Sequence, residues 1–164
     1  MIRLDLVNVG QVEETDAILL VLRAPERGQL LVIETGILEG QAIALEAQRL
    51  RTERPMTHDL LSNVIQGLGA RVEEVRIHEF KEETFFAEVV LTRTVDGGRR
   101  VSFDSRPSDA IALALRAGAP IYVADHVMDE TGIPEEIHGR FSALFDDAER
   151  ENAGTPPGGG RIVH

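Results

Sequence analysis

The sequence predicts an α+β fold with one mixed, largely antiparallel sheet and about four helices. Two observations support this prediction. Segments rich in branched aliphatic residues occur in two clusters of three, and helical segments separate the clusters. Short turn sequences, among them PERG at residues 25–28 and Asp96-Gly97-Gly98, join neighbours within a cluster, as in antiparallel hairpins. The 164 residues fit a single domain, which we expect to occupy residues 1–150.

The first cluster of strands begins at the N-terminus, and two helices follow it. Branched aliphatic residues predict three strands, at residues 2–9, 17–24 and 29–35. Apolar residues at helical spacing then predict a helix over residues 38–50. Thr57 is a suitable N-cap for a second helix, THDLLSNVIQGLG. Its apolar stripe consists of Leu60, Leu61, Val64, Ile65 and Leu68.

The second cluster repeats this order of elements. Three further strands are predicted at residues 70–80, 84–94 and 99–105. They are followed by a helix from Pro107, a short buried strand at residues 120–124 and a helix at residues 125–131. Pro134 suits the first position of a last helix, which we expect to extend to Glu149. Residues 151–164, which contain PPGGG, are predicted to be a disordered tail.

The two clusters can be superposed without a gap. Residues 1–50 placed on residues 69–118 align three strands with three strands and one helix with another. The tetrapeptide Ala-Ile-Ala-Leu at 42–45 then meets the same tetrapeptide at 110–113. One interpretation is an internal βββα duplication. The other is that this tetrapeptide is common in helices and that strands resemble one another. The matching order of elements favours duplication.

The composition is that of a globular protein with an acidic surface. The net charge is −11, which disfavours a simple polyanion binder, although a local basic cleft or a bound cation can overcome an acidic average. The chain contains no cysteine and no apolar run of about 20 residues, so we expect a cytoplasmic protein that does not enter the membrane. Without thiolates, a metal site would use carboxylates and imidazoles, which favour magnesium or manganese.

A polar tetrapeptide, Arg106-Pro107-Ser108-Asp109, begins a helix that is apolar on nearly every face. Such a helix is buried, so only its ends can meet water or a ligand. In one interpretation Ser108 or Asp109 caps the first turn and Arg106 pairs with Asp104. In the other, the free N–H groups of the first turn and Arg106 bind a phosphate. Capping is the commoner use of these residue types.

A second helix start has the same character. The stretch from Arg54 to Asp59 again combines Arg-Pro, a hydroxyl and an acid. If the two helix starts converge, one pocket would hold Arg54, His58, Asp59, Asp104, Arg106 and Asp109. Carboxylates beside a histidine could bind a divalent cation and activate water, and the arginines could hold a phosphodiester. Each residue also has an ordinary structural role as a cap or dipole partner. Six Phe and one Tyr offer little material for base stacking, and we expect Phe85 and Phe86 to pack in the core.

Three stretches resemble the bifunctional nuclease domain family of bacteria and plants. The most specific is FDSRPSDAIALALRAGAPIYVADHVMDETG at 103–132, followed by RPMTHDLLSNVIQGLGARVEEVRI at 54–77 and TGILEGQAIAL at 35–45. The resemblance covers roughly residues 1–145 and implies an activity on both DNA and RNA and a homodimer, for which the sheet edges could serve. It marks as polar site candidates Glu39, His58, Asp59, Asp104, Arg106, Ser108 and Asp109.

Two hypotheses of different kinds follow. In the first, the protein is a nuclease in which Asp59, Asp104, Asp109 and Glu39 hold a magnesium or manganese ion. His58 then acts as general acid or base, the catalytic group also includes Asp59, Asp104 and Asp109, and Arg54, Arg106 and Ser108 hold the phosphate. In the second, the same residues cap helices, and the protein is a non-catalytic module that binds an anionic ligand or a protein partner.

Overall fold

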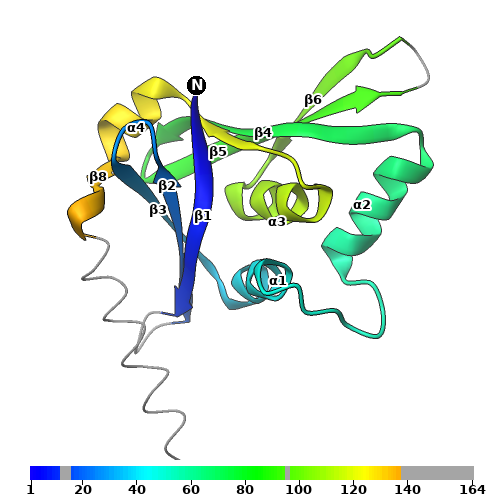
Figure 1. Cartoon of the computed structure of the whole chain (residues 1–164), viewed down its shortest axis with the longest axis horizontal. Helices are drawn as coiled ribbons and strands as arrows, with labels where there is room; N and C mark the ends of the chain where they lie inside the picture. Colours follow the sequence, from blue (N-terminus) through cyan, green and yellow to red (C-terminus); the bar gives the residue numbers. More distant parts are fainter. Residues whose placement is uncertain (12–15, 95–96, 138–164) are drawn as a thin grey trace, which may run out of the picture.

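The computed structural model of the chain describes residues 1–11, 16–94 and 97–137. These residues form one eight-stranded sheet in the order β6-β5-β4-β7-β1-β2-β3-β8 (Figure 1). The strands are β1 (Ile2–Gln11), β2 (Ala17–Ala24), β3 (Gln29–Gly36), β4 (Ala70–Lys81), β5 (Thr84–Arg93), β6 (Arg100–Ser105), β7 (Ile121–Val123) and β8 (Ile133–Pro134). The helices are α1 (Ile37–Ala47), α2 (Thr57–Gly67), α3 (Pro107–Ala117) and α4 (Asp125–Thr131), with a 3₁₀ turn η1 (Glu135–Ile137).

The sheet is mixed because of a single pairing. Strands β4 and β7 run parallel, whereas every other neighbouring pair in the described sheet is antiparallel. Consecutive strands within each cluster are joined by short turns, which leaves them antiparallel. The parallel pair arises where the chain returns through α3 to the middle of the sheet. This architecture confirms the predicted α+β fold and its four helices.

Two units with the order βββα lie on either side of β7. The first consists of β1, β2, β3 and α1, and the second of β4, β5, β6 and α3. The gapless superposition of the sequence matches the strands but is displaced at the helices. Gly36 and Arg106 are the N-caps of α1 and α3, which places equivalent helix positions 70 residues apart (106 − 36), whereas the sequence superposition uses 68 (69 − 1). The repeated Ala-Ile-Ala-Leu therefore occupies different helix positions in the two units.

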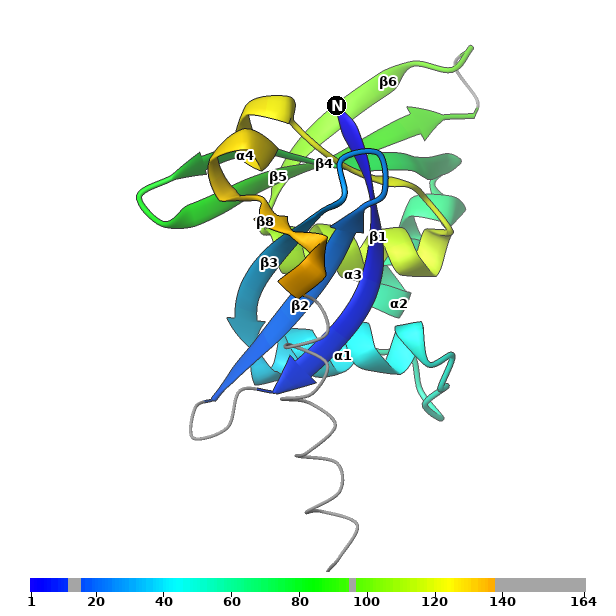
Figure 2. The same ribbon diagram turned by 60° about the vertical axis from the view of Figure 1, so that its left-hand side comes forward.

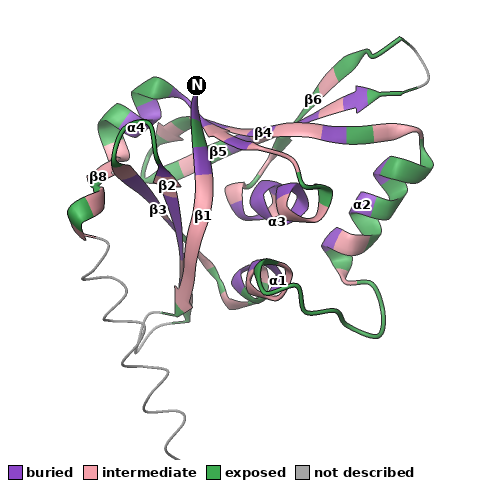
Figure 3. Ribbon diagram, viewed as in Figure 1, coloured by how far each residue is buried: buried purple, intermediate pink, exposed green. Residues whose placement is uncertain are grey.

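The core lies between the curved sheet and α3. The sheet bends around α1 and α3, which lie side by side in two views of the molecule (Figures 1 and 2). In α3 every residue from Ala110 to Ala114 is buried (Figure 3), as predicted for a helix that is apolar on nearly every face. Side chains of both units meet it there, among them Leu20, Ile43, Val75 and Ile77. Helix α2 packs against α3 and β4 at the rim of this core.

One expectation about a helix is wrong. Pro134 does not begin a helix, because it lies in β8 opposite Gln29, and the next backbone N–H, that of Glu135, donates to the carbonyl of Gly28. A proline is tolerated there because β8 is an edge strand. The next residues of that predicted helix form only the 3₁₀ turn η1. Its residues 138–149, the predicted tail at 151–164 and the end of the domain at residue 150 lie outside the described residues.

The apolar stripe of α2 does not face the core. Of its five residues only Ile65 is buried, while Leu60, Leu61, Val64 and Leu68 are exposed. The inward face carries His58, Ser62 and Ile65 instead. No helix in the described ranges is long and apolar enough to cross a bilayer.

Candidate active site

The starts of α2 and α3 lie side by side, as the sequence suggested. The Nε2 atom of His58, the second residue of α2, is 3.0 Å from Oδ1 of Asp109, the third residue of α3. His58 is buried, with 8% of its surface exposed, and Asp109 is partly exposed. A buried imidazole needs such a partner for its ring nitrogens, so this contact joins the two helices.

Arg106 connects the same aspartate to helix α1. Its Nε and Nη2 atoms donate to the two carboxylate oxygens of Asp109, at 2.7 and 3.2 Å, and its Nη1 donates to Oε1 of Glu39 at 2.8 Å. This fork geometry suits carboxylates and phosphates alike. We refer to Glu39, Arg106, Asp109 and His58 as the arginine-bridged cluster. Arg106 does not pair with Asp104, as one of the two interpretations of the sequence supposed. It binds Glu39 of α1 and Asp109 of α3 instead.

Glu39 and Asp109 reach Arg106 from equivalent helix positions. Each is the third residue of its helix, where a carboxylate interacts favourably with the partial positive charge of the N-terminus. Gly36, the N-cap of α1, leaves room for Glu39: a Cβ atom at this position would lie 2.8 Å from Oε2 of Glu39. A side chain larger than hydrogen would therefore displace the carboxylate.

Both carboxylates of the cluster remain ionised at neutral pH. The pKa of Glu39 lies below its usual 4.5 because the carboxylate accepts hydrogen bonds from its own backbone N–H and from Arg106. Burial acts to raise the pKa of Asp109, but hydrogen bonds from Arg106 and His58 outweigh it, so this pKa is also lowered from 3.8. The formal charges of Arg106, Glu39 and Asp109 sum to +1 − 2 = −1. The cluster therefore has no excess positive charge.

An open groove of about 1040 Å³ borders one side of the cluster. Glu39, Arg106 and Ser108 line it, together with residues of β3 and of the β4–β5 hairpin. The Arg106 side chain is 64% exposed there and that of Glu39 25%. Asp109 and His58 do not line the groove: Asp109 holds Arg106 from behind, and His58 binds Asp109 in turn. A groove-bound ligand would therefore meet Arg106 and Glu39 first.

Comparison with known proteins shows the family of this chain. The family model of the bifunctional nuclease domain matches residues 20–136, which include the whole arginine-bridged cluster. The chain belongs to this family. An uncharacterised protein of Mycobacterium tuberculosis is 42% identical over 134 residues, which are 80% of this chain and 78% of the relative. Bifunctional nuclease 2 of Arabidopsis thaliana is 30% identical over 137 residues, 77% of this chain and 42% of the relative. Bifunctional nuclease 2 of Oryza sativa subsp. japonica is 32% identical over 120 residues, 67% of this chain and 37% of the relative.

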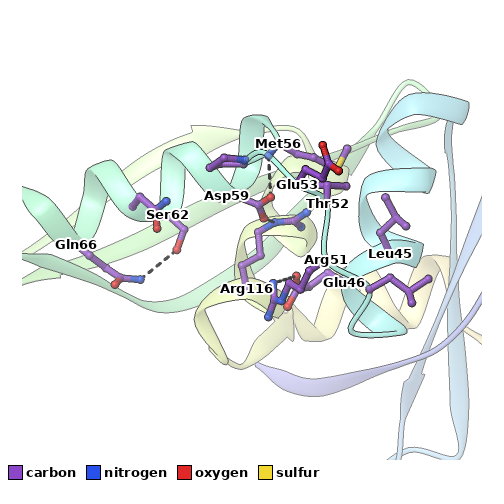
Figure 4. A pocket seen from close by; sticks show the side chains of 13 residues that line it. Leu45, Glu46, Arg51, Thr52, Glu53, Met56, Asp59, Ser62, Gln66 and Arg116 are labelled. Atoms are coloured by element: carbon purple, nitrogen blue, oxygen red, sulfur yellow. Dashed lines mark hydrogen bonds and ion pairs between the residues drawn. The ribbon is translucent and has the colours of Figure 1, made fainter.

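In this bifunctional nuclease domain, Asp59 lies apart from the cluster. Its carboxylate binds Nε of Arg116 and accepts a hydrogen bond of 2.8 Å from the backbone N–H of Met56. Burial acts to raise the pKa of Asp59, and these bonds together lower it below 3.8. Arg116, 5% exposed, also donates to the carbonyls of Ala42 and Ala112. Asp59 and Arg116 line a separate pocket of about 380 Å³ between α1 and α2 (Figure 4). This pair therefore ties α1, α2 and α3 together.

The other predicted site residues have different surroundings. Ser108 is buried and lines the groove next to Arg106. Asp104 is exposed on β6, opposite Glu88, and Arg54 is exposed in the loop before α2. Neither residue lines the groove or the smaller pocket.

Within the described ranges no three His, Asp or Glu side chains are close enough to hold a metal ion. The four predicted metal ligands thus do not fit a single cation as they stand, and we assign no step to a metal.

Sequence reasoning missed two features of the site. Arg116 is not among the predicted site residues, yet its side chain is one of the most buried charged side chains described. Phe85 and Phe86 were both predicted to pack in the core. Phe85 does pack against it, partly buried, and also lines the groove with Phe80, whereas Phe86 is exposed. The alternation of neighbouring residues across a strand was the signal that could have separated Phe85 from Phe86.

Proposed function

We propose that this domain is a nuclease that hydrolyses phosphodiester bonds of DNA and RNA at the groove beside the arginine-bridged cluster. The observation that supports this most directly is the exposed Arg106 fork, which lies 2.8 Å from Glu39. A phosphate oxygen can replace Glu39 as acceptor for Nη1, while Asp109 keeps Nε in position. Membership of a family with plant nucleases supports the same reaction class.

In this proposal Glu39 is the general base and Arg106 binds the scissile phosphate. When the phosphate binds the Arg106 guanidinium, Glu39 loses the hydrogen bond that helps to lower its pKa. The negative charge of the phosphate then lies beside the Glu39 carboxylate, so the pKa of Glu39 rises and it becomes a stronger base. It accepts a proton from the attacking water as the new P–O bond forms and the bond to the leaving oxygen breaks. The leaving oxygen takes its proton from solvent. Asp109 and His58 act as positioning residues, because both lie behind Arg106.

A nuclease assay with a conservative variant tests the proposal. Arg106→Lys keeps the positive charge but loses the planar fork, so we expect about a tenfold lower kcat/KM on labelled single-stranded DNA and RNA. Arg100→Lys is the matched control, because Arg100 is also half-exposed and also pairs with two acids, Glu73 and Glu74. Equal activity of the two variants, or a purified chain that cleaves neither substrate, would contradict the proposal. Repeating the assay with chelator tests the predicted need for magnesium or manganese.

The second hypothesis, a non-catalytic module, has one specific observation in its favour. Arg106 is already bound by two carboxylates in a protein of net charge −11, so the cluster attracts anions only weakly. A module of this kind would bind a ligand in the groove without cleaving it. The same assay separates the two, because a module would show no product in any variant.

We further propose that the domain forms a homodimer through the outer face of α2. This face presents Leu60, Leu61, Val64 and Leu68 to solvent. It carries no charge, because the helix contains only two ionisable side chains and both point inward, His58 to Asp109 and Asp59 to Arg116. Exposed apolar patches of this kind typically mark interaction sites. For two copies that each carry −11, an uncharged face is where mutual repulsion is weakest.

Two acidic substitutions on α2 test this interface. We expect the double variant Val64→Asp, Leu68→Asp to convert a dimer into a monomer, because it places four carboxylates in an apolar contact between two copies. The molar mass is measured by light scattering after size exclusion. Leu38→Asp is the control, since Leu38 is equally apolar and exposed but lies on α1. A monomeric parent chain, or a double variant that stays dimeric, would contradict the proposal.

A further inference from the structure

The groove beside Arg106 contains a pair of aromatic rings. Phe80 and Phe85 face each other across β4 and β5, with ring centroids 4.6 Å apart and planes tilted by 46°. Both are partly buried against the core, and both line the groove. Proteins bind unpaired nucleobases and their phosphates with aromatic side chains and an arginine in the same groove.

The charges around the groove limit how much nucleic acid it can hold. Arg106 is the only basic residue among the described residues that line it. The acidic residues lining it are Asp16, Glu34, Glu39 and Glu83. One guanidinium can bind one phosphate, but each further phosphate of a strand would approach carboxylates without a cation to offset them. The groove is thus suited to a ligand with a single phosphate in contact.

The shape of the ligand follows from the rings. A base in a duplex is stacked on both sides and paired, so it cannot lie against Phe80 or Phe85 without leaving the helix. A base in a single strand is free to do so, and stacking against an aromatic side chain does not depend strongly on which base it is. The volume of about 1040 Å³ lies just above the usual range for small-molecule sites, which ends at about 1,000 Å³.

We propose that the groove binds a short single-stranded unit, with one phosphate on Arg106 and one base against the Phe80–Phe85 pair. This inference rests on the proposed nuclease function and narrows its substrate to single strands that are held through about one nucleotide step. The affinity of the site depends on neither the base sequence nor the length of the strand, since the site contacts one phosphate and the face of one base. Longer strands gain no further contact in the groove, so the affinity per binding position does not rise with the length of the strand.

Binding of oligonucleotides of increasing length tests the inference. The probes are phosphorothioate-linked single strands of 2, 4 and 16 nucleotides that contain 2-aminopurine, and a 16-base-pair duplex of the same sequence. We expect the Kd per binding position to be the same for all three single strands and stacking to quench the 2-aminopurine fluorescence. With one phosphate contact, the slope of log K against log salt is expected to be about −0.7. The duplex is expected to bind more weakly.

Matched phenylalanine variants locate the base. We expect Phe85→Leu and Phe80→Leu to weaken binding roughly 5- to 100-fold, which corresponds to the loss of one stacked base. Phe86→Leu is the control: Phe86 is the next residue on β5, is exposed and does not line the groove. Thermal unfolding of each variant establishes that it is folded. If Phe85→Leu and Phe80→Leu bind like the control, or if affinity per position rises steeply with length, the inference is overturned.

The outcomes distinguish this inference from the proposed function. Oligonucleotides that bind as described but are never cleaved would remove the nuclease proposal and leave the binding site. Cleavage that is sensitive to Arg106→Lys but indifferent to both phenylalanine variants would remove the stacking site and leave the nuclease.

Discussion

Glu39→Gln is expected to lower kcat on single-stranded DNA and RNA by about 10²-fold or more, the usual contribution of a general base. Glutamine keeps the size of the side chain and can still accept a hydrogen bond from Arg106, so the loss would come from the missing proton acceptor. Glu34→Gln is the matched control, because Glu34 lines the same groove on β3 and takes no part in the proposed proton transfer. We expect its kcat to stay within about twofold of the parent.

The pH profile adds an independent measurement of the same residue. The pKa of Glu39 in the free protein lies below 4.5, so kcat/KM is expected to be flat around neutral pH and to fall only as acid protonates Glu39 below that value. The residual activity of Glu39→Gln should lack this acidic limb. A variant that retains full activity, or one with an unchanged acidic limb, would assign the base to another residue.

Arg116→Ala is expected to destabilise the folded chain by about 3 kcal/mol, as is typical when one partner of a buried ion pair is removed. The substitution leaves the partly buried carboxylate of Asp59 without its cation and the carbonyls of Ala42 and Ala112 without their donor. For a chain of this size the loss corresponds to a fall in Tm of roughly 6–12 °C. Chemical denaturation and calorimetry measure both quantities.

Two further variants make this result specific to the buried pair. Arg51→Ala removes a side chain that is 71% exposed and pairs with Glu46. We expect it to lower the free energy of unfolding by no more than about 1 kcal/mol. The double variant Asp59→Ala, Arg116→Ala should lose less free energy of unfolding than the two single variants together, because each single change leaves the other charge unpaired. Equal losses for Arg116→Ala and Arg51→Ala would show that Arg116 does not hold the three helices together.

The sequence predicted most helices and strands, because each of them depends on the types and spacing of its own residues. Alternating and branched residues identified the strands, and the uninterrupted apolar run after Pro107 identified α3 as a buried helix. The stripe on α2 shows the limit of this reasoning. Periodicity reveals that one side of a helix is apolar, but it does not reveal which surface, if any, covers that side.

The cluster itself was only partly predictable for a similar reason. The repeated Arg-Pro and acid at two helix starts correctly suggested that His58 and Asp109 meet. The partners of the two arginines were not predictable from neighbouring residues. Arg106 binds Glu39, 67 residues away, and Arg116 binds Asp59, 57 residues away. Such pairs depend on how α1, α2 and α3 pack, which no local spacing encodes.

The place of β7 in the sheet has a consequence for biosynthesis. This strand of three residues joins the two βββα units, yet it is among the last described elements to be synthesised. The first unit is complete at residue 47 and β7 at residue 123, an interval of 76 residues (123 − 47). At typical translation speeds, the edge of β1 would wait roughly 4 to 15 s for its neighbour. A nascent chain halted in this interval would expose an open strand edge to aggregation or to chaperones.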